Sequence, residues 1–246
     1  MTLRLLSYNI RYGGRGREEL LATVVRAAAP DIVVLQEATK PEVVEQLARL
    51  TEMPHWQSRR GESLAFISRQ PVAHASWYQP RVSRHAFLEI VPADSSWRIF
   101  GVHLSAVHAA WTEQRRLYEL RALLVAVQQH QAGPHALVGD FNTLAPGDLF
   151  DFRKLPARLR ALVWLSGGRI RWRTIQMVLD SGYADAFRHL QPDIVGYTFP
   201  TWDPHVRLDY LFVPRPFVDR VGCCRVVTAD PVREASDHHP LLAELH

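Results

Sequence analysis

Eight polar side chains of the kinds that bind metal ions or move protons stand at the ends of short apolar runs. They are Asn9, Glu37, His103, Asp140, Asn142, Asp209, Asp237 and His238. Hard oxygen ligands without a cluster of cysteine and histidine suit Mg²⁺ or Mn²⁺ better than zinc. A divalent ion among carboxylates neutralises a phosphate and the charge that develops on it while water attacks in line. These residue types therefore favour metal-dependent phosphate chemistry.

The apolar runs that position these side chains predict buried strands, because each run is short and bounded by turn formers. Polar residues at strand ends meet along one edge of a sheet, which is where α/β folds place their sites. We therefore expect the eight side chains to converge. The runs are Leu3–Ser7, Asp31–Leu35, Arg98–Val102, His135–Gly139, Leu208–Val213 and the last run of the chain, which follows Ser236–Pro240.

Helical spacing of apolar residues separates several of these strands. The spacing predicts helices over Arg17–Ala29, Lys40–Leu50 and Trp111–Gln131. The middle of the chain, roughly Trp56–Val91, has no helical period and predicts antiparallel strands. Together these patterns predict a layered α/β sandwich. Because there is no internal repeat or long linker, residues 1–246 are predicted to form a single domain.

The charge of the chain is concentrated in one segment. The chain has 29 basic against 25 acidic residues, a formal net charge of +4. Seven of the basic residues fall within Phe152–Leu179, which contains no acidic residue and leaves 22 basic against 25 acidic residues elsewhere. Two adjacent cysteines, Cys223 and Cys224, imply no disulfide framework. The sequence shows neither a signal-peptide pattern nor an apolar run as long as a membrane span, so we expect a cytoplasmic location.

Six short motifs resemble the endonuclease/exonuclease/phosphatase superfamily, and they occur in the order typical of it. They are SYNI at Ser7–Ile10, LQE at Leu35–Glu37, VHL at Val102–Leu104, GDFNT at Gly139–Thr143, RLDYLF at Arg207–Phe212 and SDHHP at Ser236–Pro240. The superfamily includes DNase I-like nucleases, AP endonucleases, neutral sphingomyelinases and inositol polyphosphate phosphatases. The resemblance spans nearly the whole chain and implies a four-layer α/β/β/α sandwich with two central mixed sheets.

The resemblance also implies which side chains hold the metal ion and the attacking water. Glu37 would be the principal ligand of Mg²⁺ or Mn²⁺, supported by Asn9 and Asp237. Asp140 would orient or deprotonate the water, and Asn142 would hold both Asp140 and a phosphate oxygen. Whether one metal ion or two would act is left open by the motifs.

Two histidines complete the roles that the resemblance implies. His238 would hydrogen-bond the phosphate, with its tautomer and charge state maintained by Asp209, because a carboxylate raises imidazole basicity and fixes the ring. His103 would face the leaving group or a phosphate oxygen. Neighbouring His239 is interpreted as a supporting or structural residue, and His108 as incidental.

Other polar residues in the motifs have weaker interpretations. Tyr8 and Tyr210 are predicted to fill the core, and Thr143 either braces Asp140 or caps a turn. Arg11 and Arg207 are candidate phosphate contacts, with a solvated charge as the alternative.

The substrate is narrowed by two departures from family patterns. His103 stands where the AP endonuclease branch normally carries a tyrosine, and RLDYLF departs from the inositol phosphatase signature. The remaining candidates are a DNase-like phosphodiesterase and a lipid or small-ester phosphodiesterase.

The basic segment, residues 152–179, bears on this choice. It is predicted to be a helical insertion, with helices near Pro156–Leu165 and Arg173–Leu179 on either side of Gly167–Gly168. Interleaved arginine and tryptophan could follow a nucleic-acid backbone and stack on bases, or could lie at an anionic membrane surface, or could only cover the core. The candidate substrate contacts in it are Arg169, Arg171, Trp172 and Arg173.

The interpretation we favour is a divalent-metal-dependent phosphodiesterase that acts on DNA as an endonuclease or exonuclease. A sphingomyelinase-like phosphodiesterase or phosphatase for lipids or small esters is the alternative, with an anionic membrane as its partner. An inactive nucleic-acid-binding or interaction module is disfavoured, because such a protein has no need for Glu37, Asp140 and His238 together. The sequence indicates no obligate protein partner.

Overall fold

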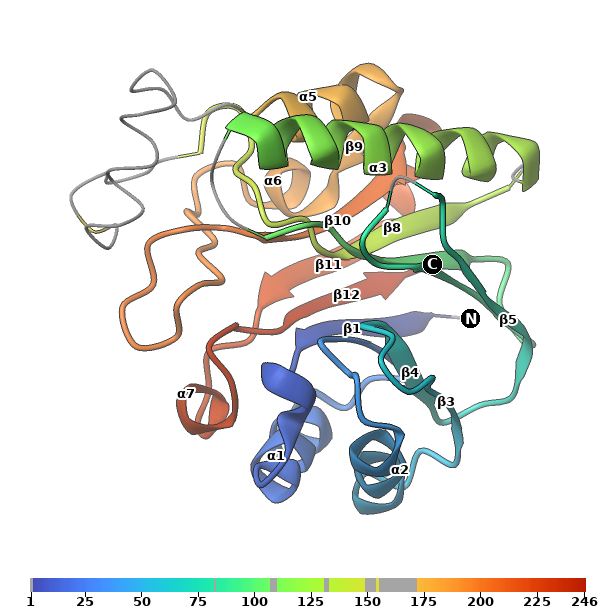
Figure 1. Cartoon of the computed structure of the whole chain (residues 1–246), viewed down its shortest axis with the longest axis vertical. Helices are drawn as coiled ribbons and strands as arrows, with labels where there is room; N and C mark the ends of the chain where they lie inside the picture. Colours follow the sequence, from blue (N-terminus) through green and yellow to red (C-terminus); the bar gives the residue numbers. More distant parts are fainter. Residues whose placement is uncertain (1, 82, 107–109, 131–132, 149–153, 155–171) are drawn as a thin grey trace.

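Two six-stranded mixed sheets lie face to face in the computed structural model of the chain, which describes residues 2–81, 83–106, 110–130, 133–148, 154 and 172–246 (Figure 1). The first sheet has the strand order β11-β12-β1-β2-β4-β3, and the second has the order β5-β6-β7-β8-β10-β9. The strands of the first sheet are β1 (Leu3–Asn9), β2 (Ile32–Gln36), β3 (His55–Gln57), β4 (Ala65–Ser68), β11 (Val221–Val226) and β12 (Leu241–Leu245). Those of the second are β5 (Val72–Tyr78), β6 (Phe87–Pro92), β7 (Arg98–His103), β8 (His135–Asp140), β9 (Tyr183–Asp185) and β10 (Asp209–Pro214).

Helices cover the outer face of each sheet (Figure 1). Helices α1 (Glu18–Ala28) and α2 (Pro41–Leu50) pack against the first sheet, and α3 (Ala110–His130) and α5 (Arg173–Asp180) pack against the second. The order of layers is therefore helix, sheet, sheet, helix, which confirms the four-layer sandwich. Short helical elements complete the described chain: η1 (Tyr12–Gly14), α6 (Ala186–Leu190), η3 (Arg215–Arg220) and α7 (Val232–Ala235).

Buried apolar side chains hold these layers together. Leu5 of β1 and Val34 of β2 pack between the sheets, in one cluster with Ile99 of β7 and Val138 of β8. Burying a side chain of this size contributes about 1.5–3 kcal/mol. The strands that carry the polar side chains are therefore fixed by apolar packing on both of their faces.

The predicted elements agree with the structure to within a residue or two at their ends. The apolar stripe predicted for the long helix is buried in α3, where Leu120 is fully covered. The second helix of the basic segment is α5, whereas the predicted helix at Pro156–Leu165 lies outside the described residues. Within the described chain, no helix is long and apolar enough to span a membrane.

Gly139 shows why the GDFNT motif begins with glycine. Its φ of 146° and its position on β8 place a would-be Cβ 1.9 Å from the carbonyl oxygen of Val102 on the adjacent strand. No side chain fits there without moving the backbone of β7, which ends at His103. The glycine therefore permits the close approach of β7 and β8 just before the two strands present their polar ends.

Candidate active site

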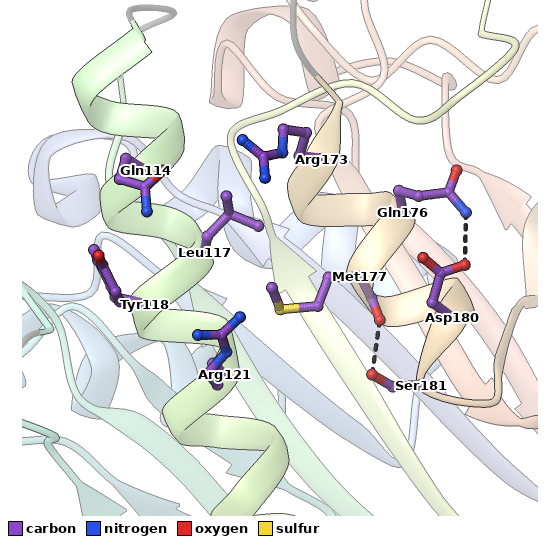
Figure 2. Close-up of a pocket in the computed structure, with 9 residues that line it drawn as sticks. All are labelled: Gln114, Leu117, Tyr118, Arg121, Arg173, Gln176, Met177, Asp180 and Ser181. Carbon is purple, nitrogen blue, oxygen red and sulfur yellow. Dashed lines mark hydrogen bonds between the residues drawn. The ribbon is translucent and has the colours of Figure 1, made fainter.

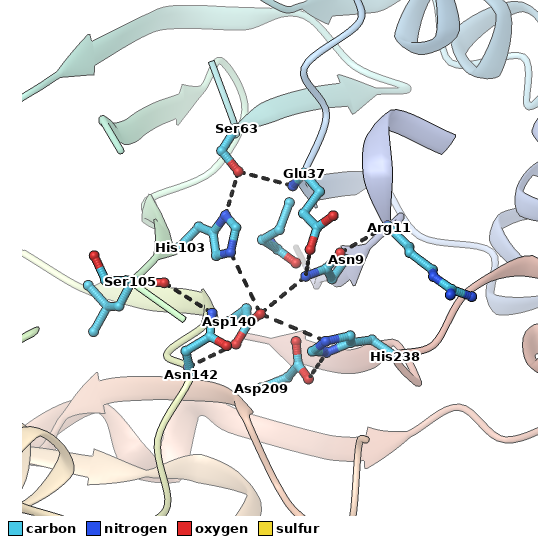
Figure 3. A network of polar contacts seen from close by, with 12 residues as sticks. Asn9, Arg11, Glu37, Ser63, His103, Ser105, Asp140, Asn142, Asp209 and His238 are labelled. Carbon is cyan, nitrogen blue, oxygen red and sulfur yellow. Dashed lines mark hydrogen bonds and ion pairs between the residues drawn. The ribbon is translucent and has the colours of Figure 1, made fainter. Parts of the chain in front are cut away.

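Three polar side chains are brought into line by the register of the second sheet. His103 at the end of β7 is paired with Asp140 at the end of β8, in parallel register. Asp209 at the start of β10 is paired with the same Asp140, in antiparallel register. Their backbone positions are thus adjacent on three neighbouring strands. An imidazole and two carboxylates therefore lie together where these strands end or begin (Figure 3).

Asp140 lies at the centre of the polar network (Figure 3). Its Oδ1 accepts the backbone N–H of Asn142 at 2.8 Å, and its Oδ2 accepts the side-chain N–H of Asn9 at 3.1 Å. Nε2 of His103 lies 3.8 Å from Oδ2, and Nε2 of His238 lies 3.9 Å from it. Burial and the neighbouring Asp209 raise the pKa of Asp140 to about 7, against the opposing effect of His238 and the two amide donors. A carboxylate with this pKa is suited to accept a proton near neutral pH.

The predicted pair of His238 and Asp209 is present. Nδ1 of His238 lies 2.9 Å from Oδ2 of Asp209, and both side chains are almost completely buried. Burial alone lowers the pKa of a histidine, but the carboxylates of Asp209 and Asp140 outweigh it and raise the pKa of His238 to about 10. The ring therefore carries a positive charge next to Asp140, with Nε2 directed toward that carboxylate.

His103 has two partners that the sequence did not indicate, Ser63 and His85. The Ser63 hydroxyl hydrogen-bonds Nδ1 of His103 and also accepts the backbone N–H of Glu37 at 3.1 Å. We assign the Ser63 hydroxyl proton to the bond with Nδ1 of His103, because Nε2 of the same ring faces the Asp140 carboxylate, an acceptor. The ring proton then lies on Nε2, the nitrogen that faces Asp140.

The ring of His85 stacks on the ring of His103. The two ring centroids are 4.6 Å apart and the ring planes differ by 6°. Burial, together with His85 and His238, holds the pKa of His103 well below its ordinary value. His103 is therefore a neutral N–H donor, in contrast to the charged His238.

The residues predicted to hold the metal ion surround Asn9. The Asn9 amide nitrogen faces both Oε1 of Glu37 at 3.4 Å and Asp140, so these two carboxylates lie on either side of one amide. The Asn9 amide oxygen accepts the backbone N–H of Arg11 at 3.0 Å, and Nε of Arg11 lies 3.4 Å from Oδ2 of Asp237. In this arrangement Asn9 donates to one predicted ligand, Glu37, and to Asp140, whereas Asp237, the other predicted carboxylate ligand, is contacted by Arg11.

The donors present fit a divalent cation that prefers oxygen. The carboxylates of Glu37 and Asp140 both lie within 3.4 Å of the Asn9 amide nitrogen, and such hard oxygen donors match Mg²⁺ or Mn²⁺. Among the described residues, the ligand atoms of Asp140, Asp209 and His238 also converge within 4.8 Å. We interpret this trio as a proton-transfer group, because Nδ1 of His238 lies at hydrogen-bonding distance from Asp209 and Nε2 of the same ring faces Asp140.

Several residues named from the sequence have structural roles. Tyr8 and Tyr210 are fully buried, as predicted, and His239 packs with Nδ1 3.2 Å from the Val227 carbonyl oxygen. Thr143 donates to Oε2 of Glu113 at 3.3 Å. His108 lies outside the described residues.

Arg207 is neither the phosphate contact nor the solvated charge that its motif suggested. Its side chain is 2% exposed and reaches Asp185 at 2.6 Å and Asp148 at 3.0 Å. Its guanidinium also lies over the Tyr210 ring, 4.4 Å from the centroid. Two carboxylates and an aromatic face compensate the buried charge, so this arginine fixes β10 to the loop that follows β8.

Two of the predicted contacts in the basic segment are described, and two are not. Arg169 and Arg171 lie outside the described residues. Trp172 is 46% exposed and Arg173 is exposed at the start of α5. Arg173 lines an open groove of about 360 Å³ between α3 and α5. Figure 2 shows the groove, with Tyr118 and Arg121 on its α3 side.

The buried carboxylate of Glu113 connects the start of α5 to the GDFNT loop after β8. Oε1 of Glu113 accepts the backbone N–H of Thr174 at 2.8 Å, while its Oε2 accepts from Thr143, the residue after Asn142. Arg116 donates to the same carboxylate at 2.9 Å and to the Ser105 carbonyl oxygen at 2.8 Å. The start of α5, the GDFNT loop and the segment after His103 are therefore held in one network.

Comparison with known proteins agrees with the family resemblance of the motifs and with the observed fold. Residues 6–238 match the profile of the Endonuclease/Exonuclease/phosphatase family. The fold is similar to a 3′ phosphatase from Neisseria solved with a product DNA hairpin, with 20% identity, 99% of each chain covered and a TM-score of 0.74. It is similar to an AP endonuclease from Archaeoglobus fulgidus, with 18% identity, 98% of each chain covered and a TM-score of 0.74. A search of curated protein sequences finds no match.

Proposed function

The chain belongs to the endonuclease/exonuclease/phosphatase family, and we propose that it is a divalent-metal-dependent phosphodiesterase that cleaves DNA. The observation that carries the proposal is the environment of Asp140. Its carboxylate has a raised pKa and faces two histidines, of which His103 is neutral and His238 is positively charged. Phosphodiester hydrolysis needs a proton acceptor for water and donors for the charge that develops on phosphate oxygens. This site supplies both, with Nε2 of His103 at 3.8 Å and Nε2 of His238 at 3.9 Å from the Asp140 carboxylate.

In the proposed reaction Asp140 accepts a proton from water, and His238 and His103 donate hydrogen bonds to the phosphate. Oδ2 of Asp140 takes the proton of the attacking water, while the Asn142 backbone N–H and the Asn9 amide hold the carboxylate in place. Nε2–H of charged His238 donates to a non-bridging phosphate oxygen, and the Asp209 carboxylate holds the ring through Nδ1. Nε2–H of neutral His103 donates to the leaving oxygen or to a second phosphate oxygen.

The cation would be held on the side of Glu37, the principal ligand that the motifs imply, whose Oε1 lies 3.4 Å from the Asn9 amide nitrogen. When bound, a divalent ion neutralises negative charge on the phosphate and on the oxygen that leaves. Asp237 was predicted as a further ligand, and in this structure its carboxylate pairs with Arg11. Reorganisation of that pair would be needed for Asp237 to reach the cation.

DNA as the substrate is supported by the fold and by the charge of the chain. The similar structures from Neisseria and Archaeoglobus fulgidus are a DNA-bound 3′ phosphatase and an AP endonuclease, respectively. Positive charge concentrated in residues 152–179 favours a polyanionic partner. The alternative of a lipid phosphodiesterase rests on the same segment, because arginine and tryptophan also suit an anionic membrane surface.

A side-by-side assay separates these substrates. Purified protein is incubated with Mg²⁺ and, in parallel, with plasmid DNA, single-stranded DNA, RNA and sphingomyelin liposomes. We expect cleavage of DNA, no lipid hydrolysis and no cleavage by Asp140→Asn. Lipid hydrolysis without DNA cleavage would transfer the proposal to the lipid branch, and DNA cleavage retained by Asp140→Asn would remove the mechanism.

A further inference from the structure

Two strongly exposed aromatic side chains, Tyr12 and Trp202, stand beside the candidate active site. Tyr12 is 77% exposed and Trp202 is 50% exposed. Single exposed aromatic residues are common on protein surfaces and need no explanation by themselves. These two differ because the backbone of Tyr12 and that of Thr201, which precedes Trp202, are hydrogen-bonded to residues of the site, while the two rings are exposed.

The backbone of Tyr12 is fixed in an unfavourable conformation. Arg11 and Tyr12 have φ values of 51° and 50°, which are uncommon for bulky residues. The conformation is held by the N–H of Tyr12, which donates to Oε2 of Glu37 at 2.5 Å, and by Arg17, whose guanidinium donates to the carbonyl oxygens of Ile10 and Arg11. Backbone strain of this kind persists where the surroundings enforce it and concentrates at ligand-binding positions.

Trp202 lies on a turn that is attached to the other side of the site. Thr201 donates its backbone N–H to the Asp237 carbonyl oxygen at 3.0 Å and its hydroxyl to the Ser236 carbonyl oxygen at 2.8 Å. The Trp202 ring meets Phe199 edge-on at 6.3 Å, and Phe199 in turn lies 4.8 Å from the ring of His238. The indole is thus one ring away from the histidine that contacts the phosphate in the proposed reaction.

Asp237 connects the two turns. Its carboxylate pairs with Arg11, which precedes Tyr12, and its carbonyl oxygen accepts from Thr201, which precedes Trp202. The turns that carry the two rings therefore both contact Asp237, and Arg11 brings a guanidinium to within 5.5 Å of the Tyr12 ring centroid. The arrangement combines two free aromatic faces with a cation beside a phosphate-binding cluster.

We propose that Tyr12 and Trp202 stack on unpaired nucleobases on either side of the reacting phosphate, so that the substrate is single-stranded or frayed nucleic acid. This inference rests on the proposed nuclease function. Bases inside a duplex already stack on their neighbours, so only unpaired bases offer both faces to a protein ring. A membrane surface fits less well, because an interfacial element presents a continuous apolar face. Here Tyr12 is flanked by Arg11, and Trp202 by exposed Asp203.

Binding is measured by fluorescence anisotropy in EDTA, with a labelled single-stranded decanucleotide and a blunt hairpin duplex. Tyr12→Leu and Trp202→Leu keep an apolar side chain but remove the ring, and Tyr12→Phe and Trp202→Phe restore it. The matched control is Tyr78→Leu at the end of β5, where the side chain is 49% exposed. We expect each leucine variant to weaken binding of the single strand about tenfold, on the scale of base–aromatic stacking. The phenylalanine variants and Tyr78→Leu should bind like the wild type.

A second readout reports stacking directly. Fluorescence of 2-aminopurine in the oligonucleotide should be quenched by the wild type, less by the leucine variants and fully again by the phenylalanine variants. Equal affinity of wild type and leucine variants, a preference for the hairpin, or binding of the wild type to anionic vesicles in place of the oligonucleotide would overturn the proposal. Cleavage of DNA by the wild type tests the nuclease function separately, because stacking is measured where no cation is available for hydrolysis.

Discussion

Ser63→Ala tests whether one hydroxyl fixes the proton of His103. In the wild type the Ser63 hydroxyl accepts the backbone N–H of Glu37 at 3.1 Å and hydrogen-bonds Nδ1 of His103, which leaves the ring proton on Nε2. The variant removes both contacts from a position that is 2% exposed. We expect the His103 ring to sample both tautomers and the Glu37 N–H to lose its partner.

The size of the effect follows from these two hydrogen bonds. A buried donor left without a partner costs about 1–3 kcal/mol, so the free energy of unfolding should fall by that amount. The hydrogen bond that orders the ring is worth about 1 kcal/mol, and 1.4 kcal/mol corresponds to a tenfold change in rate. We therefore expect kcat for bis(p-nitrophenyl) phosphate to fall about five- to tenfold.

The assay combines kinetics with ¹H–¹⁵N spectra of the imidazole rings. The wild type should show a single Nε2–H tautomer for His103, Ser63→Ala a mixture, and Ser63→Thr the wild-type tautomer. The control is Ser68→Ala at the far end of β4, another buried serine, whose hydroxyl donates to the Gln70 carbonyl oxygen at 2.7 Å. A Ser63→Ala protein that keeps the Nε2–H tautomer and the wild-type kcat would refute the reasoning.

Three further perturbations follow from contacts in the structure. Asp209→Asn removes the charge that holds His238, so kcat for bis(p-nitrophenyl) phosphate should fall about 100-fold with little change in KM; a kcat within threefold of the wild type would contradict that role. Arg207→Gln leaves buried Asp185 without its cationic partner and Asp148 with Arg188 alone, and should lower the free energy of unfolding in urea by about 3–5 kcal/mol, whereas exposed Arg60→Gln should change it by less than about 1 kcal/mol. Burial lowers the pKa of His135 in the folded chain, so protonation below about pH 6.5 favours the unfolded chain; the difference in the free energy of unfolding between the wild type and His135→Gln should therefore shift in favour of the wild type from pH 5 to pH 7, and a difference independent of pH would contradict it.

The strand ends and their polar residues could be predicted because their signals are local. Short apolar runs, turn formers and helical spacing are visible within ten or twenty residues, and they place Asp140 and His103 at ends of buried strands. The pairing of His238 with Asp209 came from the resemblance of the motifs, since 29 residues separate the two along the chain. Roles of the individual side chains in catalysis remain predictions.

The remaining features depend on which segments meet in three dimensions. Ser63 precedes β4 and His85 precedes β6, so neither carries a local signal that links it to His103 on β7. Arg207 resembles a surface arginine until Asp148 and Asp185 are seen around it. His103 and Asp140 both end predicted strands, and this pairing of a histidine with a carboxylate is the signal that points to further partners of the ring, such as Ser63 and His85.

Glu113 illustrates the same limit for helices. With Arg116 it forms an i,i+3 pair that the sequence alone would assign to a solvated helix face, yet both side chains are almost completely buried. Their burial depends on α5 and on the loop after β8, which supply Thr174 and Thr143 as partners. The pair therefore holds α5 and the loop after β8 in place beside the site, and the spacing of residues along α3 does not reveal this role.

The central claim is that Asp140 acts with a divalent cation to hydrolyse a phosphodiester. The most direct measurement is the rate of bis(p-nitrophenyl) phosphate hydrolysis as Mg²⁺ or Mn²⁺ is titrated into metal-free protein, for the wild type, Asp140→Asn and the exposed control Asp180→Asn. The rate should rise with metal and saturate for the wild type and for Asp180→Asn, and should stay at the background for Asp140→Asn at every concentration. Hydrolysis by the wild type in excess EDTA, or a metal-dependent rate for Asp140→Asn equal to that of the wild type, would contradict it.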